Sequence, residues 1–232
     1  MLAARSAINA APSEKWVNPY ITDGLVAMWD GEWNLRGGVH DANSTIWKDL
    51  VGGHKLTLDN GGSWGTNCLM CSGTARAAYG DNMTGAAPVV VEAVFKMNNM
   101  EGKWKTIWHQ GGWYSGIKPT RCIIAFYDDV LFAVNGQYDF LTLNPTSIHI
   151  DYEGNYFVAL KCNMQNIAIN QFTTSWFVQD AGNLIAIGGA KSNANTYAAN
   201  LDFYSLRLYS RTLTYEEIAH NYLVDKERFS IE

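Results

Sequence analysis

The stretch LDFYSLRLYSRTLTYEEIAHNYLVDKERFS, residues 201–230, decides the fold. Its first part, Leu201 to Tyr209, alternates in the manner of a β-strand, and a sharp turn follows it. Thr214 is a favourable helix N-cap, and Glu217 three residues later completes a capping box. The acidic first turn also suits the positive end of the helix dipole. The stretch therefore predicts a strand, a turn and then a helix. Three apolar side chains are expected to pack this helix onto the strands: Ile218, Tyr222 and Phe229.

Strand-like segments separated by turn residues fill most of the remaining chain. Short clusters of Gly and Asn recur between runs rich in β-branched and aromatic residues, which is typical of an all-β domain. In Val89 to Met97 the odd positions are apolar and form one face, whereas Glu92 and Lys96 lie on the other. Asp128–Asp129 predicts a hairpin turn. The predicted strands are 25–30, 55–58, 89–97, 106–109, 121–127, 130–134, 156–162, 166–170, 184–188 and 201–209.

The composition fits one globular domain with a short extension. The chain has 232 residues, 47% of them hydrophobic and 17% charged, and all-β sandwiches of this length occur as single units. We predict an N-terminal arm over residues 1–20 and one domain over residues 21–232. The Ala-rich arm is a candidate contact for other proteins of an assembly, such as a virion.

Charge and hydropathy argue against two classes of partner. The net charge is −5, and the closest approach to a basic cluster is Lys103 with Lys105. Nucleic acids and anionic membrane surfaces both select clustered cations. No stretch approaches the roughly 18 apolar residues of a membrane span, and the N-terminus lacks the apolar run of a secretory signal. We expect no nucleic-acid partner, no membrane insertion and no classical signal peptide.

Four short motifs follow one another along the chain. They are GLVAMWD at 24–30, the pattern W-x-D-L-x-G-x-x-x-L at 47–56, VEAVF at 91–95 and YSLRLYSRTLTYEEI at 204–218. Their order resembles that of laminin-G-like domains of the concanavalin A-like lectin and glucanase superfamily, over about residues 23–229. The resemblance implies an all-β fold: a two-sheet antiparallel jelly-roll sandwich of the concanavalin A-like type with one C-terminal helix. Members of this superfamily bind sugars, bind proteins, cleave glucans or serve as structural modules.

The acidic residues of the strand around Glu92 indicate whether the chain could act as a glycoside hydrolase. Glycoside hydrolysis usually needs two carboxyl groups about 5 to 10 Å apart, and the resemblance implies an E-x-D-x-E strand for them. Here the comparable strand has Glu92 followed by Val94 and Lys96. Glu92 is instead expected to be a structural acid, paired with a cation such as Lys96 or Arg207. We predict no catalytic residues and no enzymatic activity.

Aromatic residues in Gly-rich loops are candidates for carbohydrate binding. Sugar rings stack on aromatic faces, while their hydroxyl groups need amides or charged groups nearby. The strongest predicted group is Trp113 and Tyr114 with Gln110. The alternative for any tryptophan is a place in the core. The second predicted group consists of Trp33, Asn34 and Arg36. The tryptophans expected to be buried in the core are Trp29, Trp47, Trp108 and Trp176.

The sequence carries weaker signals for metal binding and for cysteine chemistry than for carbohydrate binding. Calcium takes six to eight oxygen ligands, and five aspartates in loops are candidates, although they form no D-x-D-x-D-G run. Cys68 and Cys71 form a lone C-x-x-C without the second pair of a zinc ribbon, so they are expected to be small buried side chains. The candidate calcium ligands are Asp23, Asp30, Asp41, Asp59 and Asp81.

These observations lead to a function hypothesis with two alternatives. The leading hypothesis is a non-catalytic, lectin-like recognition module that binds a glycan or a surface protein. It would act in cell adhesion, displayed on a bacteriophage virion or a bacterial surface. The first alternative is a purely structural virion component, and the second is an atypical glycoside hydrolase.

Overall fold

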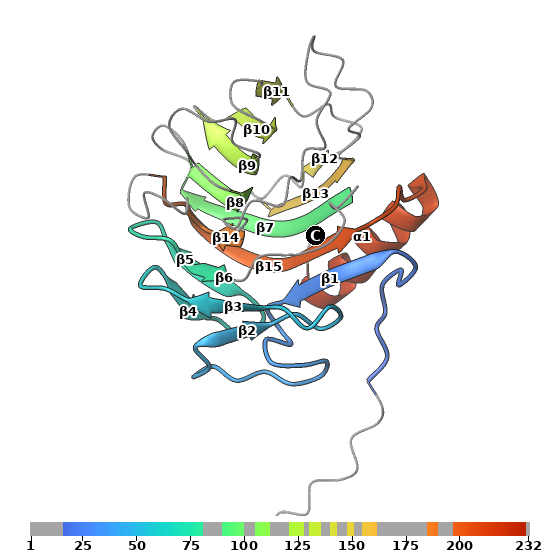
Figure 1. Ribbon diagram of the computed structural model, residues 1–232, viewed down its shortest axis with the longest axis horizontal. Coiled ribbons are helices and arrows are strands. Elements are labelled where there is room, and N and C mark those ends of the chain that lie inside the picture. Colours follow the sequence, from blue (N-terminus) through green and yellow to red (C-terminus); the bar gives the residue numbers. More distant parts are fainter. Residues whose placement is uncertain are drawn as a thin grey trace, which may run out of the picture.

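The computed structural model is a two-layer β-sandwich with a single helix in its described part. It describes residues 16–80, 90–99, 105–111, 121–127, 130–135, 140–142, 148–150, 155–161, 185–189 and 197–230. Figure 1 shows two curved sheets stacked on each other, with the helix against one of them. All pairs between the described strands of the two sheets are antiparallel.

The first sheet is built around the last strand of the chain. β15 (Asn200–Tyr209) pairs with β7 (Val90–Asn99) along one side. Along its other side β15 pairs first with β5 (Leu69–Ser72) and then with β1 (Leu25–Asp30). The described strands of this sheet run in the order β12 (Ile148–Ile150), β13 (Asn155–Lys161), β7, β15, β5 and β4 (Gly62–Trp64), with β1 beside β15.

The second sheet contains the remaining described strands. Its order is β11 (Phe140–Thr142), β10 (Val130–Asn135), β9 (Arg121–Tyr127), β8 (Lys105–Gly111), β14 (Ile185–Ile187), β6 (Ala78–Gly80), β3 (Lys55–Leu58) and β2 (Ile46–Lys48). β9 and β10 pair as the predicted hairpin, with Tyr127 opposite Val130.

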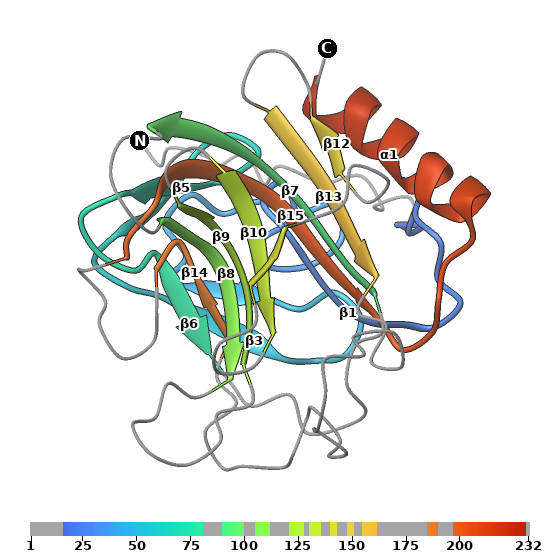
Figure 2. The ribbon, with the colours of Figure 1, turned by 90° about the horizontal axis from the view of Figure 1, so that it is seen from above.

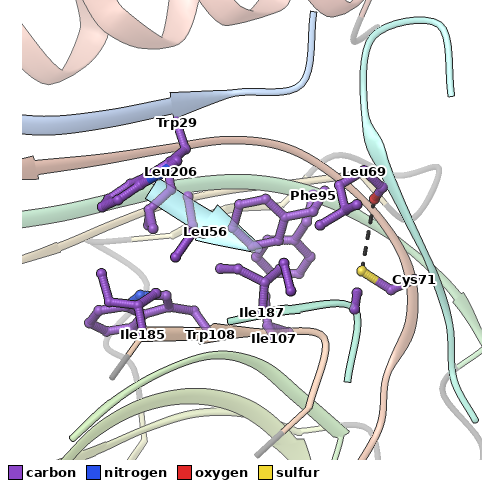
Figure 3. Close-up of a cluster of buried hydrophobic side chains, with 14 of the residues drawn as sticks. Trp29, Leu56, Leu69, Cys71, Phe95, Ile107, Trp108, Ile185, Ile187 and Leu206 are labelled. Atoms are coloured by element: carbon purple, nitrogen blue, oxygen red, sulfur yellow. Dashed lines mark hydrogen bonds between the residues drawn. The ribbon is translucent and has the colours of Figure 1, made fainter. Parts of the chain in front are cut away.

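Aromatic and aliphatic side chains fill the space between the sheets. Val91, Ala93 and Phe95 of β7 point inward, as the alternation of this strand predicts, and belong to the main core cluster. Figure 3 shows Trp29, Trp108 and Phe95 in this cluster. Trp29, Trp47 and Trp108 are fully buried, which confirms their predicted place, while Trp176 lies outside the described residues.

The helix α1 (Tyr215–Phe229) covers the outer face of the first sheet. Figure 2 shows it next to β13, on the side away from β8, β9 and β10. Thr214 is its N-cap, and both hydrogen bonds of the predicted capping box with Glu217 are present. Phe229 packs on Val94 from the outer face of β7, with Ile218 and Tyr222 alongside. The predicted helix, its cap and its packing face are confirmed.

The all-β two-sheet sandwich with one C-terminal helix is thus confirmed. Several short strands were not predicted, namely β2, β4, β5, β6, β11 and β12. The segment 166–170, predicted as a strand, lies outside the described residues. Among the described residues α1 is the single helix, and it is not long and apolar enough to cross a bilayer.

Candidate functional site

Glu92 lies on the outer face of β7, beneath α1. Alternation along the strand turns Val90, Glu92 and Val94 away from the core, and α1 covers this face, so Glu92 has no exposed surface. A carboxyl group in such a place needs a partner, because burial without one costs several kcal/mol.

Arg207 supplies that partner across the strand pair. Arg207 of β15 lies opposite Glu92 in the register of the two strands, and its Nε lies 2.8 Å from Glu92 Oε2. The contact expected between these residues is therefore present, and neither side chain is exposed. Arg207 also donates to Asp225 of α1 through both of its terminal nitrogens, one of them 2.8 Å from Oδ1. The guanidinium group thus joins two strands to the helix.

Asn221 binds the same carboxylate from one helical turn before Asp225. Its Nδ2 donates to Glu92 Oε2 over 2.8 Å and lies 2.9 Å from the hydroxyl of Tyr209. Its Oδ1 accepts from the backbone N–H of Ile21 over 3.0 Å. Asn221 is fully buried and connects sheet, helix and N-terminal segment.

The segment Trp16–Ile21, which we call the strap, closes this arrangement. The ring of Tyr20 lies 4.0 Å under the Arg207 guanidinium, and its hydroxyl donates to Asp225 Oδ1 over 2.6 Å. His220 Nε2 lies 3.0 Å from the carbonyl oxygen of Pro19. The strap therefore packs against α1 of the same chain, and it includes residues 16–20 of the predicted arm.

Arg228 links the end of α1 to the end of β1. Its terminal nitrogens donate to both oxygens of Asp30 over 2.7 and 3.0 Å and to Glu32 over 2.7 Å. Its guanidinium group also lies 3.4 Å from the ring centroid of Trp33. We call the connected buried and nearly buried side chains the Arg207 cluster: Tyr20, Asp30, Glu92, Arg207, Tyr209, Asn221, Asp225 and Arg228.

The electrostatics of the cluster follow from its burial. Burial raises the pKa of Glu92 and of Asp30 above their ordinary values, against the lowering effect of the neighbouring arginines. Burial also raises the pKa of Tyr20 and of Tyr209, so both remain neutral phenols. The carboxyl groups of Glu92 and Asp225 are fully buried against one guanidinium group. These contacts hold the helix on the sheet and leave neither acid open to a substrate.

The spacing of the helix residues carried a signal of this cluster. Asn221, Asp225 and Arg228 recur at intervals of four and three, so they share one face of α1, next to the apolar positions. Tyr20 and Asp30 gave no such signal, because their partners lie about 200 residues away along the chain.

The second predicted ligand group lies in the loop after β1. Trp33 is half-buried between the Arg228 guanidinium on its face and Trp16, whose ring meets it edge-on at 5.3 Å. Asn34 is fully buried and exchanges two hydrogen bonds with the backbone of Asp41. Arg36 is exposed. Of the three residues, Arg36 is therefore the one that faces solvent. Trp33 and Asn34 mainly make contacts within the protein.

The side chains of the first predicted ligand group lie outside the described part of the structure. Trp113 and Tyr114 lie outside the described residues, and Gln110 lies in β8 with its side chain outside the described part. Their role in binding stays a prediction.

The aspartates predicted as calcium ligands have separate partners. Asp23 pairs with Arg211 at 2.7 Å and Asp59 with Arg76 at 2.6 Å. Asp30 belongs to the Arg207 cluster, Asp41 accepts from the Asn43 backbone, and Asp81 lies outside the described residues. Within the described ranges no three His, Cys, Asp or Glu side chains are placed to hold a metal ion. Calcium binding stays a prediction.

Cys68 and Cys71 are buried free thiols. Cys68 directly precedes β5 and Cys71 lies within it, and the hydrophobic core contains Cys71. Burial raises the pKa of the Cys68 thiol to about 12 and that of Cys71 above its ordinary value. Both behave as small core side chains rather than as nucleophiles.

Comparison with known proteins gives a likeness of fold. No protein-family model and no curated protein matches the chain. Among solved structures it resembles Trypanosoma rangeli sialidase in complex with sialic acid, with 15% identity and a TM-score of 0.59 over 88% of this chain and 33% of that chain. For the 2,3-difluorosialic acid covalent intermediate of the same sialidase, the identity is 14% and the TM-score 0.63, over 96% of this chain and 36% of that chain. The chain thus spans about a third of the sialidases it matches.

This comparison corrects the function hypothesis. The chain was expected to be a non-catalytic recognition module of a virion or bacterial surface, but the solved structures that it matches over most of its length are sialidases. The comparison therefore contradicts the leading hypothesis. The absence of enzymatic activity stays a prediction.

Tyr20 lies close to two arginines, with the Arg207 and Arg228 guanidinium groups 4.0 and 5.5 Å from its ring centroid. Its hydroxyl is buried and donates to Asp225, and burial raises its pKa. A nucleophile needs a lowered pKa or an adjacent base within reach of substrate, so Tyr20 serves the fold.

Proposed function

We propose that this chain is the β-sandwich unit of a glycoside-processing protein and that it contacts the glycan. The observation that carries the proposal is the fit of 88 to 96% of the chain onto about a third of a sialidase. In those proteins a unit of this size forms part of a chain about three times as long. The Arg207 cluster is buried, so we expect the glycan to be contacted by other residues on the surface of the sandwich.

Arg36 is the described residue best suited to a charged sugar. It is exposed on the loop after β1, where Trp16 packs over Gly37 so closely that a Cβ there would lie 2.0 Å from the ring. The guanidinium group of arginine binds carboxylates through two parallel hydrogen bonds. Sialic acids carry a carboxylate, so Arg36 is our candidate contact for an acidic sugar.

Titration with 3′-sialyllactose and with lactose, followed by calorimetry, tests the proposal. We expect the sialylated sugar to bind and Arg36→Ala to weaken it at least about tenfold, which corresponds to about 1.4 kcal/mol. Lys55→Ala removes an exposed cation from β3 and is the matched control. Trp113→Ala tests the first predicted group in the same titration.

The proposal fails if neither sugar, nor any member of a broad glycan array, binds the chain. Binding that Arg36→Ala leaves unchanged would retain glycan contact and remove Arg36 from it. A parallel assay for free sialic acid released from 3′-sialyllactose measures whether the chain alone has activity.

We further propose that the sandwich is laminin-G-like. The closing strand, turn and capped helix support this proposal, since β15 and α1 lie in the order that the resemblance implies. An experimental structure whose strand connections depart from a jelly roll would contradict it.

A further inference from the structure

The buried carboxyl groups of the Arg207 cluster outnumber its cations. Among the described side chains, Asp30, Glu92 and Asp225 are fully buried acids, whereas Arg207 and Arg228 are the guanidinium groups that face them. The phenols of Tyr20 and Tyr209 stay neutral. Glu32 and His220 lie at the rim, where Glu32 is partly exposed and His220 is exposed. With all three acids ionised, the cluster would hold one uncompensated buried negative charge, which is strongly unfavourable.

The three acids differ in how many hydrogen-bond donors are available to stabilise their ionised form. Asp30 accepts from both terminal nitrogens of Arg228 and from the N–H groups of Glu32 and Trp33. Asp225 accepts twice from Arg207 and once from Tyr20, so it too is well supplied with donors.

Glu92 differs from the other two acids. Both of its donors, Arg207 Nε and Asn221 Nδ2, bind the same oxygen, Oε2. Its other oxygen, Oε1, is buried and has no described donor. Oε1 has no described acceptor either, but leaving a buried neutral hydroxyl unpaired costs less than leaving a buried charged oxygen unpaired. The geometry therefore suits a carboxylic acid better than a carboxylate.

We propose that Glu92 holds a proton in the folded protein and that loss of this proton to solvent, as the pH rises, loosens the strap and α1 from the first sheet. Ionisation converts the carboxylic acid to a carboxylate and a solvated proton, and it leaves the charge on an oxygen without donors. The strap and the helix meet Glu92 through Asn221 and Arg207, so they are the elements that respond.

The direction of the pH effect follows from the raised pKa of Glu92. A group that binds its proton more tightly when folded contributes stability at pH values below its unfolded pKa, and this contribution is lost as the pH rises through the folded pKa. The folded protein is therefore expected to lose stability as the pH rises from the ordinary pKa of a glutamic acid, 4.5, to the raised pKa of Glu92.

Glu92→Gln is the matched test, because glutamine has the shape of a neutral glutamic acid. Its side-chain oxygen can accept from Arg207 and Asn221 as Oε2 does. We expect urea unfolding midpoints of the wild type and Glu92→Gln to agree at pH 5. Towards pH 9 the wild-type midpoint falls below that of the variant, and hydrogen exchange of the α1 amides speeds up in the wild type alone. Because His220 is present in both proteins, the difference between them isolates Glu92.

Glu32→Gln, at the exposed rim of the cluster, is the control and keeps the wild-type pH profile. The proposal is overturned if Glu92→Gln fails to fold or has a lower midpoint at every pH, since a permanently ionised Glu92 paired with Arg207 behaves in that way. Infrared difference spectra of the wild type provide a second measurement. The C=O band of a protonated carboxyl group must be present at pH 5 and disappear towards pH 9, and its absence at pH 5 also overturns the proposal.

Discussion

Replacing Arg207 with methionine tests whether the Arg207 cluster holds the sandwich together. The guanidinium group binds Glu92, Asp225 and the hydroxyl of Ser205 and lies over the ring of Tyr20, with no exposed surface. Methionine keeps the apolar stem and removes every one of these contacts. Losing one partner of a buried ion pair costs about 3 to 5 kcal/mol. Since domains are stable by about 5 to 15 kcal/mol, Arg207→Met should remove a large part of the total.

Urea denaturation followed by circular dichroism at neutral pH measures this loss. We expect a lower midpoint with an unchanged dependence on urea, which signals a change in stability rather than in compactness. A triple variant in which Glu92 and Asp225 also become leucine should recover most of the loss, because apolar replacement of a whole buried ionic group is often neutral or stabilising. Arg36→Met, at an exposed arginine, should stay within about 0.5 kcal/mol of the wild type. A loss below about 1 kcal/mol for Arg207→Met would refute the reasoning.

Three further predictions concern α1 and the core. Thr214→Ala removes the hydroxyl that accepts a hydrogen bond from the backbone N–H of Glu217 and should cost about 1 kcal/mol in urea unfolding; no change would show that the cap is dispensable. Leu206→Ala opens a cavity in the main core and should cost about 2 to 5 kcal/mol, whereas Leu223→Ala on the exposed helix surface should stay within about 0.5 kcal/mol. The hydrogen bond from Arg211 lowers the pKa of Glu217 from 4.5 to about 2. A lowered folded pKa contributes stability above the unfolded value and loses it as the pH falls, so Glu217→Gln should flatten acid unfolding between pH 4.5 and about 2. An unaltered acid profile would contradict this assignment.

Local chemistry explains what the sequence could predict. The alternation of β7 determined both of its faces, because side chains of a strand point to opposite sides in turn. The capping box located the start of α1, because Thr214 and Glu217 act on backbone groups within a few residues. Periodicity could not identify β2, β4 or β6, since three residues are too few to show an alternating pattern.

Features that depend on distant residues were harder to predict. β5 has the alternating burial of an ordinary strand, but its four residues are too few to show that pattern in the sequence. The pair of Glu92 and Arg207 was one of two options until the strand register placed them opposite each other. Tyr20 lies under Arg207 only because the strap crosses α1, and nothing near Tyr20 in the sequence indicates that crossing.

The pairing of β1 with β15 constrains how the polypeptide can fold during its synthesis. β1 leaves the ribosome well before its partner in the sheet, because Leu25 pairs with Tyr209 near the other end of this domain. Until β15 emerges, β1, β5 and β7 lack the strand that they share, and unpaired strand edges of that kind favour aggregation. Nascent chains that stop before residue 200 should therefore depend on chaperones to stay in solution.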